Sequence, residues 1–145
     1  MSRLIFVNLP VRDLARATAF YEAVGAAKNA QFSDGTASCM VFSETIHAML
    51  LTHDKFRQFT PKPIADARTT SEVLICLSAD SRAAVDAMID SAGRAGGRMD
   101  PCPRQDHGFM YGRSFEDPDG HIWEVIWMDM EAANTAMASK ASAGD

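Results

Sequence analysis

An internal repeat restricts the fold of this chain more than any other feature of its sequence. In each copy a strand residue is followed by a helix cap and then by a glycine that ends the helix, and the copies are separated by a constant 68 residues. The matching positions are Leu9, Asp13 and Gly25 in the first copy and Leu77, Ser81 and Gly93 in the second. A repeat of this length indicates two similar structural units. We therefore predict an α+β fold with two tandem β-α-β-β-β modules, whose strands form a concave mixed sheet.

The first module is predicted at residues 1–54. Apolar residues alternate over residues 4–9, which is typical of a strand, and Asp13 is a suitable N-cap for a helix that continues to about Val24. Short turn sequences separate the strands that we predict next, over residues 27–32, 37–42 and 46–52.

The second module is predicted at residues 72–129, after a polar connector at residues 55–71 that contains two prolines. A strand over residues 73–79 precedes a helix that is capped by Ser81 and ends near Ala92. The remaining strands are predicted near residues 98–102, 109–115 and 121–128. The tail, residues 130–145, is rich in alanine and serine, and either a loose helix or disorder fits its composition.

Glu124 is the main candidate for a functional residue. Asp117-Pro118-Asp119-Gly120 predicts a tight turn before the last strand. In that strand Ile122, Glu124 and Ile126 share one face. A carboxylate between two isoleucines is costly to bury without a partner. Glu124 is therefore either a catalytic or ligand-binding group in a pocket or a structural carboxylate paired with Arg113.

Composition excludes several classes of function. The chain of 145 residues has a formal net charge of −5 and no cluster of Lys or Arg, which argues against binding nucleic acid. No apolar run is long enough to span a membrane, and no signal peptide is recognisable. The three cysteines are widely spaced, which is typical of a reducing compartment. We expect a cytoplasmic protein with no nucleic-acid or membrane partner.

Two segments carry a resemblance to a known family. Val7-Asn8-Leu9-Pro10-Val11, followed by Asp13-Leu14, and the Glu116–Gly120 segment before the last strand resemble the vicinal oxygen chelate superfamily. That superfamily includes glyoxalase I, the bleomycin-resistance proteins and the extradiol dioxygenases. The resemblance covers roughly residues 3–129. It is closest to bacterial glyoxalase-like proteins labelled as predicted lactoylglutathione lyases, through residues 39–42 and 108–115.

The resemblance also implies where a metal ion would bind. Metal-dependent members place one ligand on each of four strands, and in glyoxalase I these ligands are His or Gln, Glu, His and Glu. The corresponding positions in this chain are Phe6, Leu50, Leu74 and Glu124. Only Glu124 has a donor atom, so we expect no metal cofactor. The alternative is a divalent ion held by Glu124, Asn8 and Cys76, with His107 supplied by a loop.

The resemblance implies two hypotheses about function, both with a small molecule bound in a cleft between the modules. The first is a lyase or isomerase similar to glyoxalase I. The second is a metal-free binding protein that sequesters its ligand, as bleomycin-resistance proteins do. The expected lining residues are Phe6, Asn8, Leu50, Leu74, Cys76, His107, Tyr111, Arg113 and Glu124.

The role of Tyr111 and Arg113 and the way in which two copies of the chain would associate are two further points that the sequence raises. Tyr111 and Arg113 share a face of their strand, which either grips a ligand or packs against a helix. We also expect a homodimer, with Trp123 and Trp127 supplying apolar area at the seam.

Overall fold

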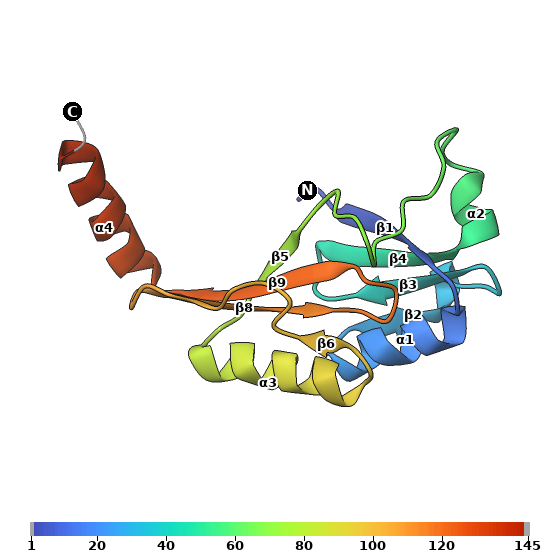
Figure 1. Ribbon diagram of the computed structural model, residues 1–145, viewed down its shortest axis with the longest axis horizontal. Coiled ribbons are helices and arrows are strands. Elements are labelled where there is room, and N and C mark those ends of the chain that lie inside the picture. Colours follow the sequence, from blue (N-terminus) through green and yellow to red (C-terminus); the bar gives the residue numbers. More distant parts are fainter. Residues whose placement is uncertain (1, 144–145) are drawn as a thin grey trace.

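The computed structural model describes residues 2–143. Met1, at the start of the predicted first module, and residues 144–145, at the end of the predicted tail, lie outside the described residues. The elements of the first module are β1 (Ile5–Val11), α1 (Leu14–Ala23), β2 (Ala27–Asn29), β3 (Ala37–Val41) and β4 (Ile46–Thr52). They form a four-stranded sheet with the order β1-β4-β3-β2, in which β1 and β4 are parallel (Figure 1).

The second module repeats this arrangement. Its elements are β5 (Ile75–Ser78), α3 (Arg82–Arg94), β6 (Arg98–Met99), β7 (Gln105–Asp106), β8 (Met110–Glu116) and β9 (Ile122–Met128). The order is β5-β9-β8-β6, and β7 also pairs with β8. The predicted fold class is therefore confirmed.

Three segments differ in detail from the elements predicted above. The strand predicted over residues 27–32 ends at Asn29, whose side chain accepts a hydrogen bond from the Gln31 amide and starts a 3-10 turn, Ala30–Phe32. The strand predicted at residues 98–102 ends at Met99, and the chain then bends before the short β7. The connector begins with a helix that was not predicted, α2 (His53–Arg57), capped by Thr52.

The tail forms a helix, α4 (Met130–Ala143), which extends away from the two sheets (Figure 1). Of the two alternatives left open for this segment, the described residues adopt the helix. No helix among residues 2–143 is long and apolar enough to cross a membrane.

Helices α1 and α3 lie on the same side of the sheets, as Figure 1 shows. Both predicted N-caps are present, because Asp13 accepts from the Arg16 amide and Ser81 from the Ala84 amide, each at 3.0 Å. The helices cover one face of each sheet, which we call the helix-covered face. The opposite side, which carries no helix of its own module, is called the open face.

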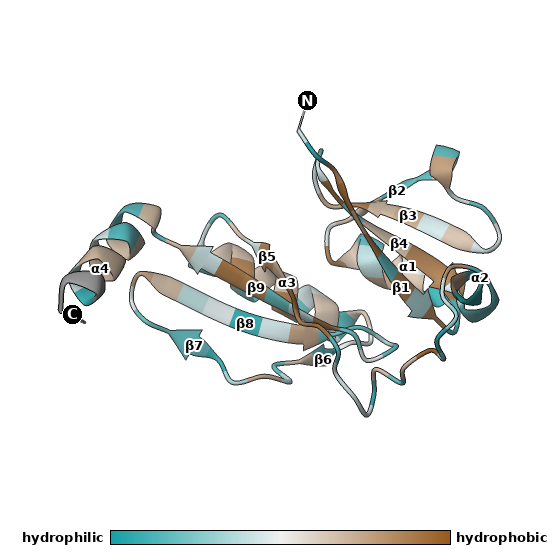
Figure 2. Cartoon of the chain, turned by 90° about the horizontal axis from the view of Figure 1, so that it is seen from above, coloured by the Kyte–Doolittle hydropathy of each residue, from teal (hydrophilic) through white to brown (hydrophobic). Residues whose placement is uncertain are grey.

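One apolar core extends through both modules on the helix-covered face. Leu9, Val11, Phe20 and Tyr21 of the first module pack in the same cluster as residues of the second. The second module contributes mainly Leu77, Val85, Ile89, Phe115, Trp123 and Val125. Full burial of each large side chain contributes about 1.5–3 kcal/mol, so this shared core holds the modules together. Figure 2 shows hydrophobic colouring on parts of both sheets, with polar colouring between.

A buried polar cluster crosses the boundary between the modules. Asp117 is only 4% exposed, and its carboxylate accepts hydrogen bonds from the Tyr21 hydroxyl at 2.5 Å and from the amides of Asp119 and His121 at 2.9 Å. Trp123 Nε1 donates to the Tyr21 hydroxyl at 2.9 Å. Burial raises the pKa of Asp117 and, together with the nearby Asp117 charge, raises the pKa of Tyr21 well above its usual value.

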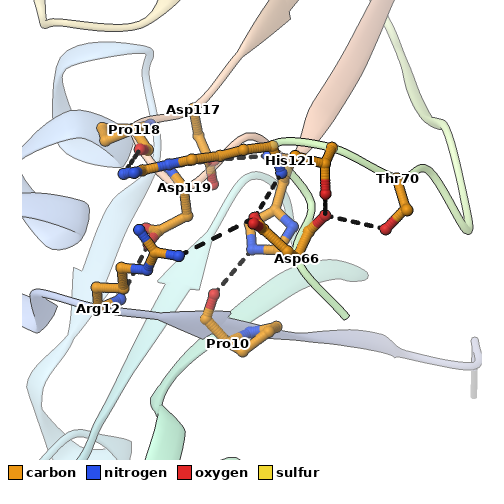
Figure 3. Close-up of polar contacts among 10 residues, drawn as sticks. Pro10, Arg12, Asp66, Thr70, Asp117, Pro118, Asp119 and His121 are labelled. Carbon is orange, nitrogen blue, oxygen red and sulfur yellow. Dashed lines mark hydrogen bonds and ion pairs between the residues drawn. The ribbon is translucent and has the colours of Figure 1, made fainter. Parts of the chain in front are cut away.

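The turn after Asp117 also holds the connector (Figure 3). The Arg68 guanidinium donates to the Pro118 carbonyl at 3.0 Å, and the Arg12 amide donates to Asp119 Oδ1 at 2.9 Å. His121 Nε2 lies 2.8 Å from the Pro10 carbonyl oxygen. These contacts bring the connector, β1 and the start of β9 together at one point.

Gly120 makes this close approach possible. Its φ is +94°, and a Cβ atom at this position would lie 2.8 Å from both Ala67 C and Arg68 N. A left-handed conformation alone costs a residue with a side chain about 1–2 kcal/mol. A side chain at Gly120 would therefore add a steric clash with the connector backbone to this cost.

We predict that Gly120→Ala lowers the free energy of unfolding, measured by urea denaturation, by clearly more than Gly25→Ala does. Gly25 is the matched control because its φ is +109° and no atom lies within 4 Å of a Cβ added there. The control should lose only the conformational cost of about 1–2 kcal/mol. Equal losses in the two variants would show that the connector does not press on the turn.

Candidate functional site

Glu124 lies on the open face of the second sheet. Its Cα neighbours across the strands are Cys76 on β5 and Ser114 on β8. The three side chains therefore form a row across the sheet. Glu124 is half-buried, and its carboxylate has no hydrogen-bond or ion-pair partner among the described side chains. This places a carboxylate without a protein partner on a largely apolar surface.

A hollow of about 250 Å³ contains this carboxylate. Leu74, Met110 and Ile126 supply its apolar sides, while Gly112 and Ser114 lie next to Glu124 on the floor. A Cβ atom at Gly112 would lie 3.1 Å from Ile126 Cγ2, so the absence of a side chain leaves room on the floor. The outer wall consists of Cys102, Pro103 and Gln105. We call this space the Glu124 hollow.

Two further hollows lie where the modules meet the connector. The junction hollow, of about 310 Å³, is lined by Asn8 and Pro10 of β1, by Ile75 and Ile122 of the second module, and by connector residues between 60 and 73. An adjacent hollow of about 290 Å³ has a polar lining that includes Arg12, His53, Arg57, Asp66 and Asp119. None of the three hollows contains both Asn8 and Glu124, which were expected in one cleft.

The structure separates the other residues that were expected to line the cleft. Leu74 borders the Glu124 hollow, and Cys76 lies beside Glu124 but is exposed. Phe6 is 48% exposed on the open face of the first sheet, whereas Glu124 lies on the second sheet. His107 is exposed in the turn between β7 and β8, with its ring centroid 6.3 Å from that of Phe109. None of Phe6, Cys76 and His107 lines one of the three hollows.

Leu50 does not lie in a pocket, contrary to expectation. It is 0% exposed and belongs to the core, because its partner across β1 and β4 is the buried Leu9. The expected position on β4 was wrong by one residue, because Glu124 on β9 corresponds to Met49 and not to Leu50. A shift of one residue exchanges the two faces of a strand. On β4 the residues that face the open side are His47, Met49 and Leu51.

His47 is a residue that sequence reasoning missed. Its ring stacks on Phe6 with centroids 4.5 Å apart and planes 19° apart. Its Nδ1 atom is buried and has no hydrogen-bond partner among the described residues. The only signal in the sequence was the alternation of β4, which with the correct register places His47 beside Phe6.

Tyr111 and Arg113 lie on the helix-covered face, so of the two alternatives left open for them the structure shows the one in which they pack against a helix. The Tyr111 hydroxyl donates to Asp86 Oδ1 on α3 at 2.7 Å. Arg113 borders the Glu124 hollow, but its guanidinium donates to Asp86 at 2.9 Å and to Asp100 at 2.9 and 2.7 Å. These bonds raise the pKa of Arg113 and lower the pKa of Asp100. Arg113 therefore pairs with aspartates on its own side of the sheet and not with Glu124.

The tryptophans of β9 do not form an exposed seam. Trp123 is 1% exposed in the shared core. Trp127 packs against the core, and the Arg82 guanidinium lies 5.4 Å from the centroid of its ring. Their alternation with Glu124 places both on the helix-covered face, which explains why they pack inward.

The donor set around Glu124 does not fit a catalytic metal ion. Among residues 2–143, no three or more His, Cys, Asp or Glu side chains are grouped so that they could hold one. The neighbour of Glu124 with a donor atom on β5 is Cys76. The pKa of its thiol is raised because neighbouring atoms partly desolvate the sulfur, although the residue is exposed, and because the Glu124 charge lies nearby. A protonated thiol is a poor metal ligand and a poor nucleophile.

Comparison with known proteins identifies the family. The model of the Glyoxalase/Bleomycin resistance protein/Dioxygenase superfamily matches residues 3–125. The chain belongs to this superfamily. The chain has no match among curated proteins.

Several solved structures share the fold. Hypothetical protein SA1046 from S. aureus is 24% identical, with a TM-score of 0.73 over 88% of this chain and 95% of that one. A glyoxalase/bleomycin resistance protein/dioxygenase family enzyme from Burkholderia phytofirmans is 19% identical, with a TM-score of 0.69 over 88% and 99%. The fosfomycin resistance protein FosX from Mesorhizobium loti is 20% identical, with a TM-score of 0.62 over 88% and 92%.

Proposed function

We propose that this protein binds a small molecule in the Glu124 hollow without a metal ion, and that Glu124 anchors the ligand. The observation that supports this most strongly is the carboxylate itself, which is half-buried and has no partner among the described side chains. Burying a charge is costly unless it is paired, and a ligand that supplies a donor removes this cost. The proposal replaces the expected cleft between the modules with a hollow on one of them.

The hollow favours a particular class of ligand. A negative anchor with no arginine or lysine free beside it selects a cationic or N–H-bearing group. Leu74, Met110 and Ile126 favour a flat apolar body next to that group. The volume of about 250 Å³ lies just below the range of about 300–1,000 Å³ that is typical of ligand pockets, so it suits a small molecule.

Binding without catalysis is the function that the residues support best. The lyase or isomerase hypothesis requires a metal ion that polarises two oxygens, and the donor set around Glu124 does not provide for one. His107 and Tyr111, two expected lining residues whose side chains could carry a proton, do not line the hollow. Two similar solved structures are fosfomycin resistance proteins. A resistance-type protein that sequesters its ligand is consistent with that likeness.

We also propose that the protein is a cytoplasmic homodimer. All three cysteines are free thiols, which suits a reducing compartment. Exposed apolar side chains lie at one free edge of each sheet: Leu4, Ile5 and Phe6 on or next to β1, and Val73 and Leu74 just before β5. Ile5 and Phe6 match Val73 and Leu74 at the repeat spacing of 68. A second copy would cover both equivalent edges, and through Leu74 it would reach the rim of the Glu124 hollow.

We predict that benzamidine, a flat aromatic cation, binds the wild-type protein at least about tenfold more tightly than the Glu124→Gln variant, because a hydrogen bond to a charged group contributes about 1.5–3 kcal/mol. Isothermal titration calorimetry would measure both affinities. Benzamide and benzoate have nearly the same shape and carry no charge and a negative charge, respectively, so both should bind more weakly than benzamidine.

Glu72→Gln is the matched control for this prediction, because Glu72 is exposed and lies outside the Glu124 hollow. Its affinity for benzamidine should equal that of the wild type. A preference for benzoate, or equal binding of benzamidine by the wild type and Glu124→Gln, would contradict the proposed function.

We predict that light scattering after size-exclusion chromatography gives a mass of twice 15.8 kDa, the mass of one chain. The double variant Ile5→Asp and Leu74→Asp should be monomeric, because it places charges on both exposed edges. Met137→Asp, which changes a 67% exposed residue on α4, should stay dimeric. A monomeric wild-type protein would refute the dimer.

A further inference from the structure

The outer wall of the Glu124 hollow is a segment with little support from the sheet. Residues 100–106, which we call the wall segment, contribute Cys102, Pro103 and Gln105 to the hollow. Two of its residues form a ladder with β8, Gln105 with Gly112 and Asp106 with Tyr111, and the Asp100 amide donates to the Ser114 carbonyl at 2.8 Å. The segment also begins in an unfavourable conformation, because Asp100 has a φ of +54°. Side-chain contacts add to these few backbone bonds in fixing its position.

An arginine holds the first end of the wall segment. Arg113 Nε and Nη2 donate to the two carboxylate oxygens of Asp100 at 2.9 and 2.7 Å, while Nη1 donates to Asp86 on α3 at 2.9 Å. The Arg113 side chain is 9% exposed, so this pair is largely shielded from water. Charge-assisted bidentate pairs of this kind fix geometry as well as contributing energy.

A second arginine holds the other end. Arg82, in the first turn of α3, donates to Asp106 through Nη1 at 2.9 Å and through Nη2 at 2.8 Å, and to the Gly108 carbonyl at 3.1 Å. Its guanidinium lies over the rings of Tyr111 and Trp127, 4.9 and 5.4 Å from their centroids. Both side chains of this pair are accessible to solvent, at 40% and 51%.

The arginine contacts lie on the helix-covered face, but they also fix side chains on the open face, because consecutive residues of β7 point to opposite faces. Because Asp106 points toward α3, the preceding residue, Gln105, points into the hollow. Between the two ends, the Cys102 amide donates to Ser114 Oγ at 3.0 Å. Ser114 is the neighbour of Glu124 across the strands. The wall segment is therefore fixed relative to Glu124 at three points.

We propose that Arg82 and Arg113 are positioning residues for the Glu124 hollow, which set the place of its wall through their contacts with aspartates on the opposite side of the sheet. This inference rests on the proposed function for the identity of the site and adds what controls its shape. The Arg113 pair with Asp100 is the less exposed of the two attachments. The Arg82 pair is exposed to solvent, and its loss frees the wall to move away from Glu124.

The reactivity of Cys102 tests this inference without any ligand. Each thiol of the intact protein is labelled with iodoacetamide, and the rate at each cysteine is read by mass spectrometry. In Arg82→Ala we expect Cys102 to react roughly two- to fivefold faster than in the wild type, the factor that corresponds to the loss of an exposed ion pair. Arg82→Lys, which keeps the charge but not the two-pronged geometry, should fall between them.

The other two cysteines are internal controls. Cys76 is exposed on the open face and Cys39 is buried, so neither should change in Arg82→Ala. Asp106→Asn should raise the rate at Cys102 in the same direction. Arg57→Ala, which breaks the exposed pair with Asp54 on α2, should leave the rate at Cys102 unchanged. An unchanged Cys102 in Arg82→Ala, or an equal gain at all three thiols, would overturn the inference.

Benzamidine binding separates this inference from the proposed function. In Arg82→Ala the affinity for benzamidine should fall while its preference over benzoate is retained, because Glu124 is intact. Suppose that Cys102 is labelled faster in Arg82→Ala but that the variant binds benzamidine as tightly as the wild type does. This result would overturn the role of the wall segment in binding. Faster labelling of Cys102 in a protein whose wild type does not bind benzamidine would refute the proposed function and leave the attachment of the wall standing.

Discussion

Asp117 accepts a hydrogen bond from Tyr21 of the other module, and the same hydroxyl accepts one from Trp123. All three side chains are buried in the core that the modules share, so the loss of one partner would leave a buried polar group unsatisfied, at a cost of about 1–3 kcal/mol. The cluster therefore fixes how the modules meet. The turn that begins at Asp117 leads directly into β9, and β9 carries Glu124 to the open face of its sheet. The position of the candidate site follows from this junction.

Membership of the Glyoxalase/Bleomycin resistance protein/Dioxygenase superfamily accounts for the fold, while the side chains on the open face define the site. The resemblance in sequence aligns Phe6 and Leu74 with ligand positions of metal-dependent members, and neither side chain has a donor atom. Around Glu124 the chain supplies apolar side chains, a serine and thiols instead. These residues leave the negative charge of Glu124 in place without the further ligands that would let a metal ion neutralise it. A ligand with a positive or N–H-bearing group satisfies the same carboxylate.

The repeat and the helix caps were sufficient to predict the fold, because Asp13 and Ser81 cap their helices as their residue types indicate. The facing of Glu124 was also predictable from alternation along β9. The sequence could not place Leu50, because a strand with apolar residues on both faces does not reveal its register. The roles of Arg82 and Arg113 depend on Asp86, Asp100 and Asp106. These aspartates are distant in sequence or lie in a bend, and only the folded chain shows that they surround the two guanidinium groups.

The most direct test is a crystal structure determined from protein incubated with benzamidine and with nickel and zinc ions, with diffraction data collected at the absorption edges of both metals. The account predicts the benzamidinium group within hydrogen-bond distance of the Glu124 carboxylate and its ring between Met110 and Ile126, with no anomalous peak at Glu124. A metal ion coordinated by Glu124, or benzamidine bound only elsewhere while the Glu124 hollow holds solvent, would contradict the account.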